Sequence, residues 1–376
     1  MLETLQSEIL SGKEALSSLA KDWDELFERA TDAPPCLSYA WLSTFITEGR
    51  LRGTPLFIEV RCGKKLVALL GLAIRHFFGV RIAEPIGTGY PSYLGILVDP
   101  EYQGAVECVV DTFLKRKVAL VLSNNDLYSQ DVATIRLLDV LAKKGFLCLR
   151  VQRNPCHRIR LECSYEEYLR TTKNSFERRR LRRNERRTSD IGEVEVEHYI
   201  GREITSGIIE RVSSIQQASW MKRRGANVFI QPFYRKLLTE MGGASLCHVW
   251  LLKINASDVA FAVAFVAHKI LYYEWIAFDL KYESSKIAVG QLLTGRVIQY
   301  ACSNGLAYFD FSHGDARYKR FWSNECHVVY RAVAGWGFLG RILTIFYFIL
   351  WWLGRKQWLR SLYHRVRRYY TTLKGR

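Results

Sequence analysis

The chain has 376 residues, and its contents of 49% hydrophobic and 13% aromatic residues exclude a disordered protein. This length allows two domains of ordinary size, each with its own core. The formal net charge of +17 indicates anionic partners: a CoA pyrophosphate, an acidic carrier protein, a nucleic acid or an anionic membrane face. The nine cysteines are scattered without a CxxC pair, which favours reduced thiols over a disulfide framework or a zinc site.

The first 155 residues predict a lobe of antiparallel strands with crossing helices. Residues 1–16 are acidic and amphipathic and do not follow the pattern of a signal peptide, so we expect a cytoplasmic protein. The glycine-rich segment 87–91 favours a plain turn over a phosphate cradle, and Asn154-Pro155 predicts a turn before one more strand. Predicted helices span 23–28, 39–48, 103–116 and 131–144, and predicted strands span 56–61, 66–77, 80–86, 93–98, 118–122, 146–152 and 157–161.

A single arginine-rich helix is predicted over residues 165–187. Between Lys173 and Arg187 eight basic residues stand against two acidic ones. Such a run is either a solvated helix face or an anion-binding surface. No aromatic residues alternate with the arginines, so the pattern does not indicate stacking on single-stranded bases.

The chain then predicts a strand at 194–198, helices at 204–221 and 232–241, and strands at 246–254 and 259–268. The segment 219–225 between the two helices is expected to be a loop bordering a substrate cleft.

A strand–helix–strand unit follows, and we expect the rest of the chain to be organised around it. The aromatic run 272–278 predicts a buried strand, and 279–286 a loop. Gly290 begins a helical pattern that ends at Asn304-Gly305, and 306–311 predicts the returning strand. Such a crossover favours parallel pairing of the two strands, and the N-terminus of the helix would be a binding site for a pyrophosphate.

Three short motifs occur in this unit and just after it: Gly290-Gln291-Leu292-Leu293, Phe309-Asp310-Phe311, and Gly314-Asp315-Ala316-Arg317-Tyr318-Lys319 with Trp322. Together they resemble the second half of the CelD-like and BioF2-like acetyltransferases of the GNAT superfamily. That family is similar in turn to the Fem-type peptidyl transferases, which are built from two GNAT lobes. The sequence departs from the family pattern at Val289, where proline is common, and at Ser312-His313, where Leu-Arg is common.

The resemblance implies an α/β (α+β) fold of two tandem GNAT-like lobes, with mixed sheets flanked by helices, and N- or O-acyltransferase activity. Its donor would be acyl-CoA, acetyl-CoA or a longer chain, with no metal. The residues expected to bind the donor are Val289, Gly290, Gln291, Leu292, Arg179 and Arg183.

Six residues near the ends of the two expected parallel strands are candidates for the chemistry. His313 has the pKa best suited to base catalysis at neutral pH, although it stands where the family pattern is broken. Lys319 could stabilise an oxyanion, and Tyr318 could donate a proton to a leaving thiolate. The alternative is that these residues only pack and cap. The candidates are Glu274, Asp310, His313, Asp315, Tyr318 and Lys319.

The C-terminal segment differs from an ordinary globular ending. Residues 342–353 carry no charge, but they are fewer than the ~20 apolar residues that a spanning helix needs. Trp351, Trp352 and Trp358, with the arginines that follow, favour an amphipathic helix lying on an anionic membrane surface. The alternative is a terminal helix packed on the lobes.

We therefore expect an N-terminal lobe (1–155), a C-terminal lobe with the donor site (156–335) and a basic, apolar C-terminal helix (336–376). The acceptor would be an amine or hydroxyl of a cell-envelope or polysaccharide precursor, linked to a glycan or a lipid, and an acyl carrier protein is a second expected partner. An aminoacyl-tRNA donor and a non-catalytic, membrane-bound scaffold for polyanions are the alternatives.

Overall fold

The structure is a computed structural model that describes residues 4–77, 79–90, 93–102, 104–219, 221, 228–282 and 287–354. Several expectations fall outside this part of the chain: Pro91 of the glycine-rich turn, residues 283–286, Trp220 and 222–225 of the cleft loop, the side chains of Trp351 and Trp352, and the basic segment 355–376 with Trp358.

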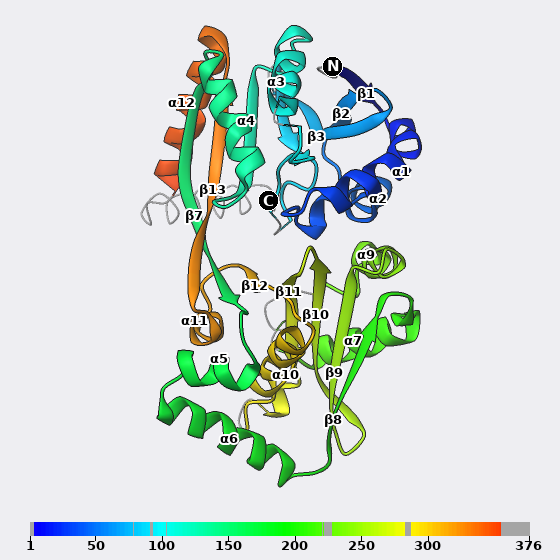
Figure 1. The fold of residues 1–376 in the computed structure, drawn as a ribbon, viewed down its shortest axis with the longest axis vertical. Coiled ribbons are helices and arrows are strands. Elements are labelled where there is room, and N and C mark those ends of the chain that lie inside the picture. Colours follow the sequence, from blue (N-terminus) through cyan, green and yellow to red (C-terminus); the bar gives the residue numbers. More distant parts are fainter. Residues whose placement is uncertain are drawn as a thin grey trace, which may run out of the picture.

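The first half of the chain forms one lobe, drawn in blue to green at the top of Figure 1. Its strands run mostly antiparallel, with helices on both faces, because the strands are apolar on both sides. The elements are β1 (Leu5–Ser11), α1 (Glu14–Arg29), α2 (Tyr39–Thr47), β2 (Thr54–Cys62), β3 (Lys65–Phe77), β4 (Val80–Pro85), β5 (Leu97–Val98), α3 (Ala105–Lys115), β6 (Val121–Tyr128), α4 (Val132–Lys143) and β7 (Leu147–Arg160).

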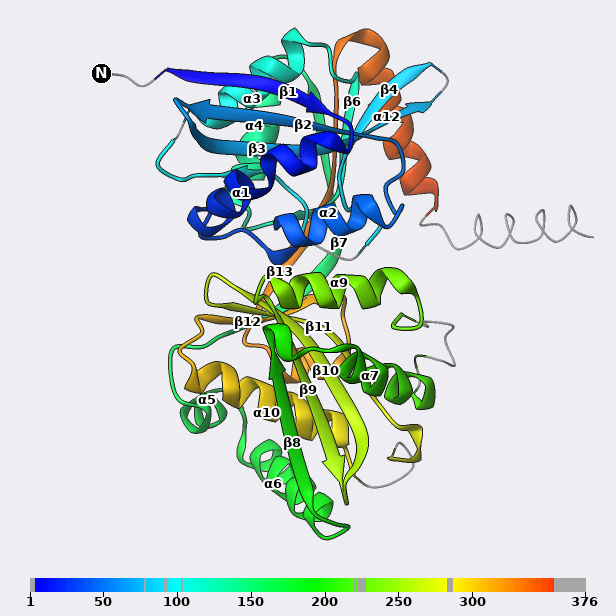
Figure 2. The ribbon, with the colours of Figure 1, turned by 90° about the vertical axis from the view of Figure 1, so that its right-hand side faces the viewer.

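The second half forms the lower lobe, with α10 on one face of its sheet and α7 and α9 on the other (Figure 2). The predicted strand–helix–strand unit at its centre is confirmed, because β11 and β12, which precede and follow α10 in the chain, pair in parallel. The elements of this lobe are α5 (Tyr165–Thr172), α6 (Ser175–Ser189), β8 (Val194–Ile200), α7 (Ser206–Ala218), α9 (Pro232–Gly243), β9 (Cys247–Ile254), β10 (Ser257–Ala267), β11 (Ile270–Phe278), α10 (Val289–Ser303), β12 (Tyr308–His313) and α11 (Arg317–Trp322). The chain then returns to the upper lobe with β13 (Glu325–Gly335) and α12 (Gly337–Gly354), drawn in orange in Figure 1.

One continuous mixed sheet joins the two lobes. Its strand order is β1-β2-β3-β4-β6-β13-β7-β12-β11-β10-β9-β8, with β5 beside β3. Each lobe contains one parallel strand pair, β4 with β6 and β11 with β12. A helix lies between the two strands of each pair in the chain, α3 in the first lobe and α10 in the second. The fold is therefore a tandem repeat of two α/β lobes of the same topology, as the sequence predicts.

The lobes exchange their last strands. β13 comes from the second half of the chain, yet it pairs with β6 and β7, and β7 in turn pairs with β12 of the second lobe. Figure 1 shows β7 and β13 running side by side from the upper lobe to the junction. The expected boundary between residues 155 and 156 consequently falls inside β7.

A shared apolar core adds to the sheet at the junction of the lobes. On α2 of the first lobe, Trp41 packs edge-on against Phe265 of β10, with ring centroids 5.4 Å apart. Phe45 of the same helix contacts Phe233 of α9 at 6.0 Å. These side chains are buried in one cluster that extends from α1 to α9, so the lobes bury apolar surface against each other.

Three local predictions are wrong. Of the strand predicted over 93–98, only Leu97 and Val98 are in a strand. The predicted helix over 165–187 is two helices, because Asn174 caps the start of α6. The Asn174 side chain accepts a hydrogen bond from the Glu177 backbone amide, and the Glu177 carboxylate accepts one from the Asn174 backbone amide. The predicted turn at Asn154-Pro155 lies within β7, where Pro155 stands opposite Val328 beside an irregularity in the pairing with β13. A proline lacks the amide that a regular ladder needs, and a bulge accommodates it.

In the described part of the chain, no helix combines the length and hydropathy needed to cross a bilayer.

Removing an aromatic ring from the junction should weaken the whole fold. Phe265 is 1% exposed, so Phe265→Ala should lower the free energy of unfolding by about 3–5 kcal/mol. Urea unfolding measures this loss. Phe338→Ala is the matched control, because Phe338 is 84% exposed and its loss should change stability by less than about 0.5 kcal/mol. If both variants lose the same free energy of unfolding, Phe265 does not belong to a core shared by the two lobes.

Candidate active site

The candidate active site begins where the parallel strands β11 and β12 separate. They pair only from Ile270 opposite Tyr308 to Tyr272 opposite Asp310. On β11 the register against β10 shifts so that Glu274 is an extra, unpaired residue, which is a β-bulge. On β12 the pairing with β7 skips from Asp310 to His313.

The two irregularities face each other across the separation. Ser312 has a φ of 55°, a left-handed conformation that is uncommon for a residue other than glycine, asparagine or aspartate. Its Oγ donates a hydrogen bond of 2.7 Å to Oε1 of Glu274. A side-chain bond thus connects β11 and β12 beyond the last ladder pair, and it orients the carboxylate.

Glu274 has the protonation behaviour of a general base. Burial raises the pKa of this half-buried carboxyl to about 7, although the Ser312 hydroxyl and the Lys319 ammonium favour its charged form. A carboxyl with this pKa is partly ionised at neutral pH and accepts a proton more readily than an ordinary glutamate.

Two side chains of α11 lie beside Glu274. Lys319 is buried, and its ammonium donates hydrogen bonds of 2.5 Å to the carbonyl oxygens of Phe311 and His313. Burial lowers the pKa of Lys319. For Tyr318, burial and then the charge of Glu274 raise the pKa of the phenol, so it stays protonated at neutral pH. Lys319 fixes the end of β12, and Tyr318 is available as a proton donor.

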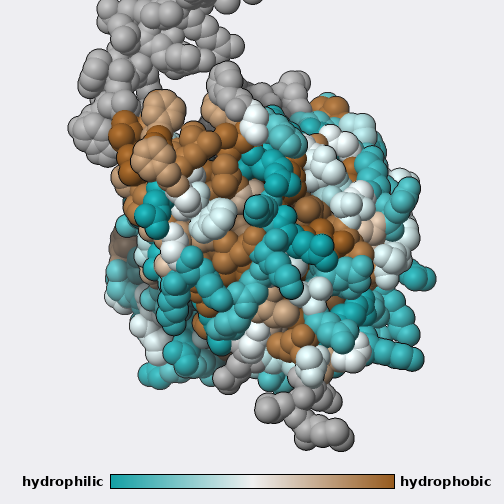
Figure 3. All heavy atoms as spheres, turned by 90° about the horizontal axis from the view of Figure 1, so that it is seen from above, coloured by the Kyte–Doolittle hydropathy of each residue, from teal (hydrophilic) through white to brown (hydrophobic). Residues whose placement is uncertain are grey.

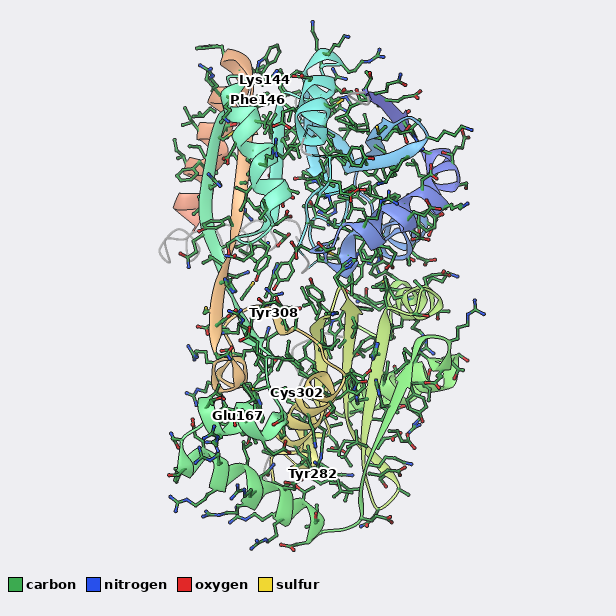
Figure 4. All side chains as sticks on the ribbon, in the orientation of Figure 1. Lys144, Phe146, Glu167, Tyr282, Cys302 and Tyr308 are labelled. Atoms are coloured by element: carbon green, nitrogen blue, oxygen red, sulfur yellow. The ribbon has the colours of Figure 1, made fainter. Side chains whose placement is uncertain are left out.

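Asp310 is fully buried and connects the lobes. Its Oδ1 accepts hydrogen bonds of 2.7 Å from the Tyr93 hydroxyl of the first lobe and from the Ser312 amide. Its Oδ2 lies 3.8 Å from Nε of Arg158 on the exchanged strand β7. The Arg158 guanidinium also stacks on the ring of Tyr308, 3.7 Å from its centroid; Figure 4 labels Tyr308 at the junction. Asp310 therefore positions the end of β12.

The two remaining candidates, His313 and Asp315, also contact residues from outside the second lobe. His313 lies against the first lobe, and Asp315 lies against β7. His313 packs beside the ring of Tyr93, and its Nδ1 is 3.7 Å from Asp126 on β6. Asp315 is 45% exposed, is hydrogen-bonded to His157 at 3.1 Å and pairs with Arg320 at 3.0 Å. The structure thus brings all six predicted chemical residues to one end of β12 and adds partners on both sides.

The predicted donor-binding residues lie at the N-terminus of α10. A pocket of about 760 Å³ is lined here by arginines of α6 together with the first residues of α10. The cationic side chains and the positive end of the helix dipole both favour an anion in this pocket. Its lining is Phe176, Arg179, Arg180, Arg183, Asn184, Arg187, Ala288 and Gln291.

The remaining donor candidates support the helix. Val289 and Gly290 are buried, and Leu292 is partly buried in the core under α10. A Cβ on Gly290 would lie 3.0 Å from Cδ1 of Phe278, so the glycine allows α10 to approach β11 closely. It is a packing residue, and among the residues at the helix start Gln291 faces the pocket.

Two contacts hold α6 in place, one with the start of α10 and one with the end of α11. The Asn184 amide accepts from the Ala288 backbone amide at 2.7 Å and donates to its carbonyl at 3.0 Å. Where α5 joins α6, the buried Lys173 ammonium donates to the carbonyl oxygens of Phe321 and Trp322 at the end of α11. Burial lowers the pKa of Lys173 to about 8.

The sequence did not predict the site residues that come from the first half of the chain. Tyr93, Asp126 and Arg158 carry no motif, and their role depends on the strand exchange, which no local pattern encodes. Ser312 was identified only as a departure from the family pattern. Among the described residues, no group of three or more histidines, cysteines or acids is arranged to hold a metal ion.

Comparisons with known proteins agree with this architecture. The family profile described as "Acetyltransferase (GNAT) domain" matches residues 175–320, from α6 to α11. No curated protein matches the sequence significantly.

Solved structures share the fold at low sequence identity. The structure of FemX is 12% identical with a TM-score of 0.57, covering 83% of this chain and 95% of FemX. The C-terminal domain of a protein described as a lysylphosphatidylglycerol synthetase from Agrobacterium fabrum is 13% identical with a TM-score of 0.56, covering 88% and 96%. A conserved protein of unknown function from Bacteroides thetaiotaomicron is 12% identical with a TM-score of 0.51, covering 88% and 100%.

Proposed function

We propose that the protein is an acyltransferase whose thioester donor, acyl-CoA, binds at the N-terminus of α10 and reacts beside Glu274. One observation carries the proposal: β11 leads from the bulged Glu274 to the arginine-lined pocket. Strands rise about 3.3 Å per residue, so Glu274 lies about 13 Å along β11 from Phe278, which touches the start of α10. An extended arm such as pantetheine can join a phosphate in the pocket to a thioester beside Glu274.

The chemistry follows from the residues at the separation of the strands. The ionised Glu274 takes a proton from an amine or hydroxyl of the acceptor as that atom bonds to the thioester carbonyl carbon. The carbon–sulfur bond then breaks, and the Tyr318 phenol gives its proton to the leaving thiolate. The proton on Glu274 returns to Tyr318 or to solvent. Holding donor and acceptor in one place removes much of the entropic barrier.

For the acceptor we propose an amine or hydroxyl on a cell-envelope or polysaccharide precursor, carried on a glycan or a lipid, in line with the resemblance to the CelD-like and BioF2-like enzymes. An acyl carrier protein is an alternative way to present the acyl group, since its acidic surface would suit the arginines of α6.

An aminoacyl-tRNA donor is the second candidate. It is favoured by the length of the basic surface, because the arginines of α6 extend over more of the helix than one pyrophosphate needs. Ribonuclease treatment distinguishes the two: it should abolish transfer from a tRNA donor and leave transfer from acyl-CoA unchanged. Absence of acyl transfer from every donor, whether a thioester or an aminoacyl-tRNA ester, would support the non-catalytic scaffold.

Neutralising the pocket should weaken donor binding. In the double variant Arg179→Ala/Arg183→Ala, two cations that line the pocket are lost, and acetyl-CoA affinity should fall at least about tenfold. Isothermal titration calorimetry measures this change.

The matched control removes equal charge from the same helix. Arg182 and Arg186 are exposed on α6 and do not line the pocket, so Arg182→Ala/Arg186→Ala should leave the affinity within about twofold. If both double variants weaken binding equally, the effect is general attraction by net charge and the pocket is not the donor site.

Removing the proposed base should change both rate and pH profile. Because Glu274 must be ionised and its pKa is about 7, turnover at saturating substrate should rise with pH up to about 7 and then level off. Glu274→Gln should reduce turnover about 10²-fold or more and remove this rise. Steady-state assays from pH 5 to 9 test both points. Glu84→Gln on β4, which removes a paired carboxylate of the first lobe, should retain the wild-type profile.

A further inference from the structure

We propose that the outer face of α12 docks on an anionic lipid bilayer. Large apolar side chains cover this face, and seven of them are between 45% and 84% exposed. Monomeric proteins rarely expose so many contiguous apolar groups without a partner. Figure 3 shows apolar residues gathered on the side of the molecule where α12 lies. The face comprises Phe338, Leu339, Ile342, Ile345, Phe346, Ile349 and Leu350.

The opposite face of α12 is fixed to the protein. Gly340 lies so close to the residue before β6 that a Cβ would meet the Leu120 carbonyl oxygen at 2.7 Å, and Thr344 is fully buried. Arg341 donates to the Gly145 carbonyl oxygen at 2.8 Å, and Tyr347 donates to Asn125 at 3.4 Å. Because one face is covered by protein, α12 can enter a bilayer only along its length, with the apolar face towards the acyl chains.

The charge of the chain selects the kind of bilayer. From Ile342 to Gly354, α12 contains no charged residue, whereas residues 355–376 contain eight lysines and arginines and no aspartate or glutamate. For a helix that lies along the surface, the apolar face meets the acyl chains, and the positive charge that follows in the sequence favours a surface with anionic phosphates. A protein partner would have to combine a hydrophobic groove with an adjoining acidic surface.

Vesicle binding tests the proposal with the full-length chain. The protein should sediment with vesicles of phosphatidylcholine containing 30% phosphatidylglycerol. The fraction that sediments with vesicles of phosphatidylcholine alone should be at least tenfold smaller. Added salt should weaken binding to the anionic vesicles but leave an apolar component. The variant Ile342→Gln/Ile345→Gln/Ile349→Gln should lower binding to the anionic vesicles at least tenfold.

The control substitutes three exposed apolar residues elsewhere, Val132→Gln/Ile191→Gln/Ile230→Gln, and should bind like the wild type. Unchanged acetyl-CoA affinity and melting temperature verify that both variants fold. The proposal is overturned if the wild type does not bind anionic vesicles, or if the α12 variant binds as well as the control. It is also overturned if the apolar face mediates dimerisation instead. In that case the wild type is a dimer, the α12 variant is a monomer, and added vesicles do not reduce the dimer fraction of the wild type.

Discussion

The exchange of β7 and β13 between the lobes is the constraint on which the rest of the structure depends. β13 pairs with β7 along most of its length, and each strand also completes the sheet of the lobe opposite to its own place in the chain. A strand inside a sheet has both rows of hydrogen-bonding groups satisfied, so separating the lobes would expose many backbone groups at once. The relative position of the lobes is thereby fixed by the backbone, and the aromatic contacts of α2 with β10 and α9 reinforce it.

This exchange also determines what surrounds the chemical residues. Because β7 lies next to β12, it delivers Arg158 to Asp310 and His157 to Asp315. The first lobe delivers Tyr93 to the same aspartate. These buried polar contacts hold the end of β12 where it turns away from β11, and the bond from Ser312 to Glu274 crosses the separation. The strained conformation of Ser312 is maintained by these neighbours, as is common at functional sites.

Much of the second lobe could be predicted from the sequence. The aromatic strand, the helix begun near Gly290 and the returning strand have local periodicity, and their parallel pairing follows from the crossover rule. Five of the six chemical candidates converge because they are close in sequence to the end of β12, and Glu274 joins them because β11 pairs with β12 in parallel. The partners from β6, β7 and the segment before β5 could not be predicted, because they are 150 to 220 residues away in sequence and meet only through the exchange. The break at Lys173-Asn174 was readable in principle, since Asn174 and Glu177 form a capping box. The high density of arginines obscured it.

The two lobes share an architecture, but their helix N-termini differ in charge, and this explains why only the second is suited to an anionic donor. α10 begins beside a pocket lined by four arginines. Its counterpart α3 has Glu107 in its first turn, and the pocket of about 460 Å³ beside it is lined by Asp32, Asp99 and Asp131 with one arginine. An anion bound there would meet negative charge that opposes the helix dipole. The first lobe instead contributes side chains to the junction, so under the proposed function one copy of the fold binds the donor and the other copy supports it.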